Sequence, residues 1–388
     1  MKTTIRLSKL LFEKYPNSAK ELVEIFDKNK ISFEEIENTK DIWARDYMPI
    51  CLDDGTLVSY IYEPNYLKDE KYKELKTQIT YEKYHLDLII DGGNFVRYKN
   101  KAIMTDKIFK ENPSKSKDEI ISTIKSISRL NELIIIPKQP YDTFGHSDSM
   151  VRWIDEKTVL INDFSNEDDV FYQKLLKTLK SHYLKIKTMK YSDDFFTKQR
   201  NWGAYLNFIK IHNILIVPTY GIKEDELALN QLKNIFTNCL IESIELNEII
   251  TQGGAMHCIT SEKKEINQYL IMEVILNEFK VLRFKIIDNI PEILEYKEFP
   301  FENIDKLKDY LKNLDYHYSV ISFDKNFYEY ETINILSDLE SSFEFDEITD
   351  DINALKLPNK FIKNGWVNLD EKRTMVLNCL VWHFIDRK

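Results

Sequence analysis

Apolar and polar positions follow one another along the chain in patterns that predict helices and strands in turn. Apolar residues recur at helical spacing in four stretches, Ser18–Lys28, Ser116–Leu130, Glu167–Tyr183 and Glu224–Phe236. Ser18 is the expected N-cap of the first helix. Short apolar or β-rich runs predict strands at Thr3–Ser8, Ile31–Ile36, Thr56–Tyr62, Leu86–Ile90, Leu133–Ile136, Val151–Ile154, Thr158–Ile161, Leu184–Tyr191, Ala204–Ile211, Ile214–Pro218 and Ile244–Ile250. The two kinds of element alternate with a period of roughly 50–60 residues, which favours an α/β fold built from similar units.

Loops between these elements carry the side chains with the most chemistry. They are Trp43–Asp46, Asp91–Asn94, Gly145–Asp148 and Gln252–Thr260. Glycine has no Cβ and tolerates positive φ, so glycine-bearing loops let the backbone approach a small ligand closely. In the last loop Cys258 follows two glycines and a strand-like run, which makes its thiol a candidate nucleophile.

Cys258 needs a partner if it is a nucleophile, because the thiolate attacks and a free thiol has a pKa of about 8.5. His146 is the best candidate, since it sits in a loop with Asp148 two residues further on. His257 directly precedes Cys258, but neighbours on an extended chain point to opposite sides, so we expect His257 to be structural. A lone apolar-context cysteine is usually a core residue, and the catalytic hypothesis therefore depends on the loops acting together.

Three of the loops each supply an aspartate, Asp46, Asp91 and Asp148. The two oxygens of a carboxylate match the N–H pairs of a guanidinium. Two of these aspartates could therefore hold a guanidinium carbon against the sulfur while the third orients the histidine. Trp43 either covers the cation by a cation–π contact or is an ordinary core tryptophan. Arg45 is expected to form a structural ion pair with Asp46.

Composition narrows the classes of function. The 388 residues carry a formal net charge of −10, which argues against nucleic-acid binding and suits a cationic substrate or plain solubility. No apolar run reaches the roughly 18–20 residues of a membrane span, and no signal-peptide pattern opens the chain. The four cysteines are scattered and form no CxxC pair, so we expect a reducing, cytoplasmic setting. No metal is expected, because His146 and Asp148 form the only tight pair of candidate ligands.

The character of the chain changes after Glu262–Glu265. We therefore expect two domains, residues 1–265 with all of these loops and residues 266–388 with none of them. Within the second domain Phe343–Asp351 is acidic and aromatic. Such a run suits a basic peptide partner, although an acidic run is more often a solvated face.

The motifs, in this order and spacing, resemble the agmatine deiminase and bacterial-type peptidyl-arginine deiminase family of guanidine-modifying enzymes. The resemblance extends over about residues 30–262. The matching blocks are Asp41–Pro49, Asp91–Asn94, Gly145–Asp148, Tyr205–Phe208 with Ile216–Gly221, and Gly253–Thr260. It implies the pentein fold, an α/β propeller of five pseudo-symmetric modules, with an additional C-terminal α+β region here.

The resemblance also implies an activity and site residues. The enzyme would need no metal or cofactor and would release ammonia from a guanidinium through a covalent amidino intermediate on Cys258. His146 would be the acid and base. The other implied site residues are Asp46 and Asp148, which would bind the guanidinium, Asp91, which would support substrate and histidine, Trp43, which would line the pocket, and Asn207, which would lie near it.

The identity of the substrate stays open at this point. Agmatine would give carbamoylputrescine, and a peptidyl-arginine would give citrulline. Agmatine deiminases carry glutamate where this chain has Asp91, which favours the peptidyl-arginine branch. Two rivals remain: an amidinotransferase, in which an amine replaces water, and a non-catalytic pentein that binds a partner through residues 266–388. The oligomeric state is open.

Overall fold

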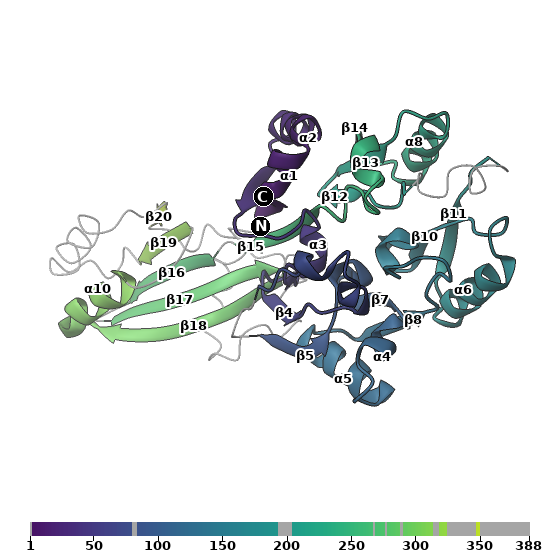
Figure 1. Cartoon of the computed structure of the whole chain (residues 1–388). Helices are drawn as coiled ribbons and strands as arrows, with labels where there is room; N and C mark the ends of the chain where they lie inside the picture. The colour runs from purple at the N-terminus through teal and green to yellow at the C-terminus, as the bar shows by residue number, and fades with distance from the viewer. Residues whose placement is uncertain are drawn as a thin grey trace. The chain divides into compact units, whose positions relative to one another are not determined.

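The chain forms two compact units in a computed structural model (Figure 1). The model describes residues 2–79, 84–192, 204–266, 268–275, 278–287, 290–312, 318–323 and 347–349. The first unit is Thr3–Lys264, and the second is Glu265–Lys388 together with Met1–Lys2. Over the described ranges, no helix combines the length and the apolar character needed to cross a membrane.

The described part of the first unit contains five small sheets of three strands each. The first sheet has the spatial order β15 (Thr260–Glu265), β1 (Lys2–Ser8) and β2 (Ser32–Ile36). The second consists of β3 (Ile50–Cys51), β4 (Leu57–Ile61) and β5 (His85–Ile89). The third consists of β6 (Val96–Tyr98), β7 (Lys101–Thr105) and β8 (Glu132–Ile136). The fourth consists of β9 (Val151–Asp155), β10 (Thr158–Asn162) and β11 (Lys185–Met189), and the fifth of β12 (Ile209–Ile211), β13 (Ile214–Thr219) and β14 (Leu240–Glu245).

The order and the direction of the strands recur from sheet to sheet. In the second to fifth sheets the first two strands are antiparallel and the last two are parallel. A parallel pair needs a crossover, which helices supply in four of the sheets. These helices are α1 (Lys9–Lys14) and α2 (Pro16–Lys28) after β1, α4 (Lys107–Glu111) and α5 (Lys117–Ile127) after β7, α6 (Asp169–Ser181) after β10, and α8 (Glu224–Ile235) after β13. In the second sheet the short turns η1 (Asn65–Lys68) and η2 (Lys73–Leu75) lie in the crossover.

The connections between the sheets occupy equivalent places in this repeat. Each begins where the last strand of a sheet ends, after β2, β5, β8, β11 or β14. Among the described residues, four of them contain short helical turns: α3 (Ala44–Tyr47), η3 (Gly92–Asn94), η4 (Ser147–Ser149) and α9 (Asn247–Ile250). All of the motif loops found in the sequence fall in these connections.

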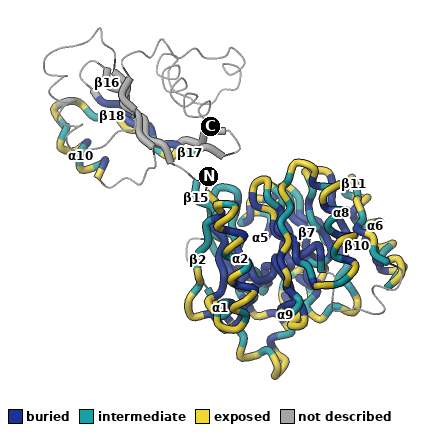
Figure 2. The backbone as a smooth tube through the Cα atoms, turned by 90° about the horizontal axis from the view of Figure 1, so that it is seen from above, coloured by how far each residue is buried: buried dark blue, intermediate teal, exposed yellow. Residues whose placement is uncertain are grey.

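Helices pack on the sheets through one apolar stripe each. Helix α5 buries Ile120 and Ile124, and α6 buries Phe171, Leu175 and Leu179. A spacing of four residues keeps these side chains on one face, and burial of each contributes about 1.5–3 kcal/mol. Figure 2 shows the result, with buried residues inside the first unit and exposed ones around its periphery.

The structure confirms most of the elements expected from the pattern and corrects three. Ser18 is not an N-cap, because α2 begins two residues earlier at Pro16, a residue that suits the first helical turn. The strand expected at Ala204–Ile211 is limited to Ile209–Ile211. The strand expected at Ile244–Ile250 is wrong: β14 ends at Glu245 and α9 follows.

The second unit has a five-stranded sheet and one helix among its described residues, which agrees with the α+β expectation. Its strands, in spatial order, are β18 (Ile290–Pro300), β17 (Glu278–Ile287), β16 (Gln268–Ile275), β19 (Tyr318–Phe323) and β20 (Glu347–Thr349). Helix α10 (Ile304–Lys312) buries Leu307 and Leu311. Except for β20, the acidic and aromatic run at 343–351 lies outside the described residues.

Candidate active site

Loops from different sheets meet around one narrow cavity of about 40 Å³ in the first unit. Of the residues predicted from the sequence, Trp43, Asp46, His146 and Cys258 line it. The remaining lining residues are Asp41, Tyr62, Tyr66, Leu67, Tyr72, Leu75, Phe144, Gln252, Gly253 and Gly254. The other three predicted residues, Asp91, Asp148 and Asn207, are buried and connect to this wall by hydrogen bonds. The structure therefore brings together all seven.

Asn207 holds the loop that carries the thiol. Its side-chain oxygen accepts hydrogen bonds from the backbone N–H groups of His257 and Cys258, at 2.9 and 3.2 Å. Its Nδ2 donates to the Cys258 Sγ at 3.3 Å. Cys258 itself is only 8% exposed. The amide thus fixes both the backbone and the sulfur of the candidate nucleophile.

Gly254 permits the close approach of the tryptophan to this loop. A Cβ at Gly254 would lie 2.6 Å from Cζ3 of Trp43 and 3.0 Å from the Cys258 Cβ. Gly253 has a φ of +102°, in the region that favours glycine. The fold therefore requires glycine at both positions, at Gly254 for lack of space and at Gly253 for its backbone conformation.

His146 is held by a buried carboxylate that carries its own counter-ion. His146 Nε2 is 2.8 Å from Asp91 Oδ2, and Lys107 Nζ forms an ion pair with the same oxygen. Lys107 also lies 3.6 Å from Glu111. Burial raises the pKa of Asp91, but Lys107 and His146 lower it by more, so that it lies below its usual value. Burial lowers the pKa of His146, but Asp91 and then Asp46 raise it to about 9.

Asp46 faces the other nitrogen of the imidazole. Its Oδ1 lies 3.6 Å from His146 Nδ1, which is too far for a hydrogen bond, and it accepts a hydrogen bond from the Gly93 N–H at 3.1 Å. A Cβ at Gly93 would lie 2.4 Å from His146 Nδ1 and 2.7 Å from Asp46 Oδ1, so both side chains depend on this glycine. Burial raises the pKa of Asp46 to about 6, even though His146 opposes this.

Asp148 lies against the sulfur with one oxygen unused. Its Oδ2 is 2.6 Å from His257 Nδ1 and 3.9 Å from Cys258 Sγ. Its Oδ1 is buried and has no hydrogen-bond partner among the described residues. Burial raises the pKa of Asp148 above its usual value. A buried carboxylate oxygen that lacks a donor is a place where a ligand can supply one.

His257 and Arg45 differ from expectation. The chain at His257 turns instead of extending. His257 Nδ1 and Cys258 Sγ both approach Oδ2 of Asp148, at 2.6 and 3.9 Å, and the structural role of His257 stays a prediction. Burial, then Arg152, holds the pKa of His257 well below its usual value, which favours the neutral imidazole. The expected Arg45–Asp46 ion pair is wrong, since the described partner of Arg45 is Glu262, at 3.7 Å.

Sequence reasoning missed Lys107 and the aromatic wall. The Phe144 ring lies 5.1 Å from Tyr66 and 5.9 Å from Tyr72, and 6.0 Å from the ring of His146. Nothing in the sequence distinguishes these residues among the 54 Lys and Arg, 22 Tyr and 22 Phe of the chain. Over the described ranges, no three His, Cys, Asp or Glu side chains are grouped so that they could hold a metal ion.

The model of the Porphyromonas-type peptidyl-arginine deiminase family matches residues 9–263, which is well over half of the 388 residues. The chain belongs to this family. The family match includes every one of the seven site residues.

This family member is similar to several known proteins at low sequence identity. A Mycoplasma capricolum protein provisionally named agmatine deiminase is 27% identical over an alignment of 213 residues that covers 46% of this chain and 58% of that protein. The chain thus spans less than two thirds of that relative.

Solved structures establish the fold. An agmatine deiminase from C. jejuni has a TM-score of 0.50 and 20% identity, and covers 68% of this chain and 93% of its own. A protein provisionally described as a peptidyl-arginine deiminase has a TM-score of 0.52 and 19% identity, with coverages of 68% and 97%. These similarities, with the five three-stranded sheets, confirm the pentein fold of this family member.

Proposed function

We propose that this protein is a guanidine deiminase that hydrolyses a C–N bond of a guanidinium and releases ammonia. The observation that carries the proposal is the placement of the Cys258 thiol 3.9 Å from Oδ2 of Asp148, whose other oxygen, Oδ1, has no donor among the described residues, in a cavity that His146 and Asp46 also line. A nucleophile, a proton carrier and carboxylates with room for N–H donors are what attack on a cationic carbon needs.

The cavity suits a slim cation. Carboxylates at Asp46 and Asp148 match the N–H pairs of a guanidinium, and the aromatic side chains of Trp43 and Tyr66 line the same cavity. At about 40 Å³ the space is narrow. We infer that the substrate is a small alkylguanidine such as agmatine, with the guanidinium at the sulfur and the alkyl chain along the aromatic wall.

Substrate binding generates the nucleophile in this mechanism. Burial, then Asp148 and Asp46, raises the pKa of the Cys258 thiol well above its usual value, so the free protein holds a neutral thiol. A guanidinium placed between these carboxylates offsets their charge and favours loss of the thiol proton to solvent, since His146 is already protonated. The reactive thiolate is therefore present mainly when the cation is bound.

His146 moves the protons of both chemical steps. With a pKa of about 9 it is an imidazolium at neutral pH. The thiolate forms a C–S bond with the guanidinium carbon, and Nδ1 of His146 protonates one amino group, which leaves as ammonia when its C–N bond breaks. A cationic amidino thioether on Cys258 remains. Neutral His146 then takes a proton from water, the C–O bond forms, and the C–S bond breaks. The protonated ureido group gives its proton to the departing thiolate, and the neutral product leaves Cys258 as a thiol.

The test is ammonia release from purified protein with agmatine, free arginine or an arginine-containing peptide. We expect turnover of agmatine. Turnover of the peptide alone would contradict the small substrate and support peptidyl-arginine, as well as the recognition role that stays a prediction for residues 266–388. If no ammonia-releasing hydrolysis is detected but the amidino group is transferred to an added amine, the protein is an amidinotransferase and not a deiminase. Silence in every assay would favour a partner-binding pentein.

The pH profile of kcat/KM provides a separate prediction. Below a pH of about 6 Asp46 becomes protonated and loses its attraction for the guanidinium. Above a pH of about 9 His146 loses the proton that the leaving group needs. We therefore expect a bell with limbs near pH 6 and 9, measured by initial rates in buffers of constant ionic strength. A rate that still rises above pH 10 would show that His146 is not the acid.

A further inference from the structure

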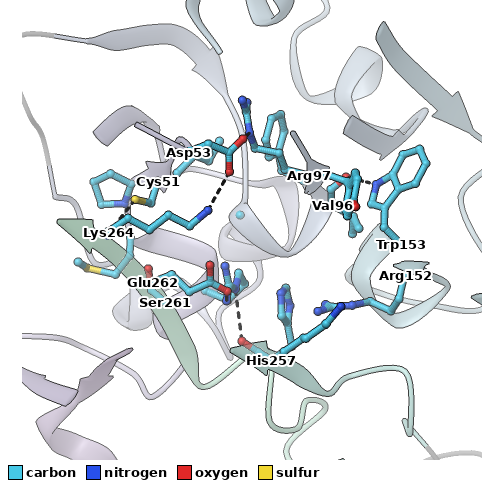
Figure 3. Close-up of a pocket in the computed structure, with 18 of the residues that line it drawn as sticks. Cys51, Asp53, Val96, Arg97, Arg152, Trp153, His257, Ser261, Glu262 and Lys264 are labelled. Atoms are coloured by element: carbon cyan, nitrogen blue, oxygen red, sulfur yellow. Dashed lines mark hydrogen bonds and ion pairs between the residues drawn. The ribbon is translucent and has the colours of Figure 1, made fainter. Parts of the chain in front are cut away.

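The first unit contains a second and larger cavity, of about 330 Å³ (Figure 3). All of the residues that line it lie within Thr3–Lys264, and none of them lines the cavity at Cys258. Some residues that line the two cavities are nevertheless adjacent in the sequence. Arg45 and His257 line the larger one, whereas their sequence neighbours Asp46 and Cys258 line the smaller one.

The wall of the larger cavity is strongly basic. Its lysines and arginines are Arg45, Arg97, Arg152, Lys210 and Lys264, and its carboxylates are Asp53 and Glu262. Five positive groups less two negative ones leave a charge of +3, with histidines neutral, although the whole chain carries −10. A cationic concavity on an acidic protein attracts anions.

Both carboxylates are already engaged with part of this wall. Asp53 lies 2.9 Å from Lys264 and 3.5 Å from Arg97. Glu262 lies 3.7 Å from Arg45. Two cations, Arg152 and Lys210, remain without a carboxylate within ion-pair distance among the described residues.

Arg152 is the side chain that most clearly lacks a partner. Its Nη1 is buried and has no hydrogen-bond partner within the part of the chain that the structure describes. Its guanidinium stacks over the ring of Phe208, with 4.8 Å from Cζ to the ring centre. Figure 3 draws Arg152 and Lys264 on different sides of the cavity. A charged nitrogen that is buried without a partner is costly, and an anion that pairs with it removes this cost.

We propose that this cavity binds a small multivalent oxyanion, a molecule that carries phosphate or carboxylate groups, through Arg152, Lys210 and Arg45. A guanidinium fork binds either group in a bidentate manner. A volume of about 330 Å³ suits a small metabolite. Trp153 and Phe208 supply an aromatic wall for the body of such a molecule.

Titration calorimetry of the full chain tests the proposal, with pyrophosphate and citrate as probes and sodium chloride holding the ionic strength constant. We expect saturable binding of one anion per chain and a rise in melting temperature that follows its concentration. Binding of pyrophosphate alone would assign a phosphate-bearing ligand, and binding of citrate alone would assign a carboxylate-bearing one.

Single substitutions distinguish binding of the anion in the cavity from attraction to any positive charge on the surface. Arg152→Met is expected to weaken binding at least tenfold. Lys210→Met is expected to do the same and is a safe second variant, because Lys210 is exposed. Lys187→Met removes one exposed positive charge outside the cavity and should leave binding unchanged. The proposal is overturned if neither anion binds, if binding does not saturate, or if Lys187→Met weakens it as much as Lys210→Met does.

Discussion

Replacing Cys258 by alanine is expected to reduce kcat for ammonia release by at least about 10⁴-fold, because it removes the atom that forms the covalent bond. Binding should survive, since Asp46, Asp148 and the aromatic wall are unchanged. The experiment compares initial rates of ammonia release with agmatine affinity, measured by calorimetry on the variant. Mass spectrometry of acid-quenched wild-type protein should also show an amidino adduct that the variant lacks.

Cys239→Ala is the matched control for this prediction. Cys239 is a half-buried thiol that packs beside the core of the first unit and lines neither cavity. Its replacement should cost some stability and leave kcat unchanged. A Cys258→Ala variant that is folded, binds agmatine and still turns it over within tenfold of wild type would end the covalent mechanism.

Replacing Asp91 by asparagine is expected to reduce kcat by about 10²–10⁴-fold, the range of a general acid or base. The amide can keep a hydrogen bond to His146, but it cannot supply the negative charge that raises the pKa of that imidazole. The alkaline limb of the pH profile should therefore move down from about 9 towards neutrality. The measurement is kcat/KM across pH, which a merely structural defect would lower without shifting the limb.

Two further variants make this result specific. Asp87→Asn removes an exposed carboxylate from β5, the strand that precedes Asp91, where Asp87 pairs with Lys115 at 3.5 Å. It should change neither rate nor pH profile. Lys107→Gln removes a cation that lowers the pKa of His146, so the limb should move up instead of down. Shifts of the same sign in Asp91→Asn and Lys107→Gln would contradict the assigned roles.

The fold was largely predictable because burial leaves a local pattern. Helix α6 places Phe171, Leu175 and Leu179 four residues apart, and this spacing in the sequence predicts the helix and its buried face. The failure at Ile244–Ile250 has the same physical origin. Leu246, Ile249 and Ile250 are buried on one side of a short helix, and a short apolar run does not by itself distinguish helix from strand.

The site was predictable only where its residues sit in recognisable loops. Cys258, His146 and Asp91 follow the last strands of three sheets, and their neighbours in sequence marked them. Lys107 follows β7 without any such motif, and its role depends on the packing that brings it to Asp91, 16 positions away. Arg152 is likewise an ordinary strand arginine until the fold surrounds it.

The order in which the chain is made bears on how the ring of sheets closes. Strand β15 pairs with β1, and Arg6 donates a hydrogen bond to Ser261, 255 positions further on. A nascent chain emerges from the ribosome N-terminus first, so β1 must wait for almost the entire first unit before its second edge is covered. Cys258 arrives just ahead of the closing strand. Interrupted translation products would therefore combine a missing nucleophile with an open strand edge, the kind of edge through which unfinished chains associate.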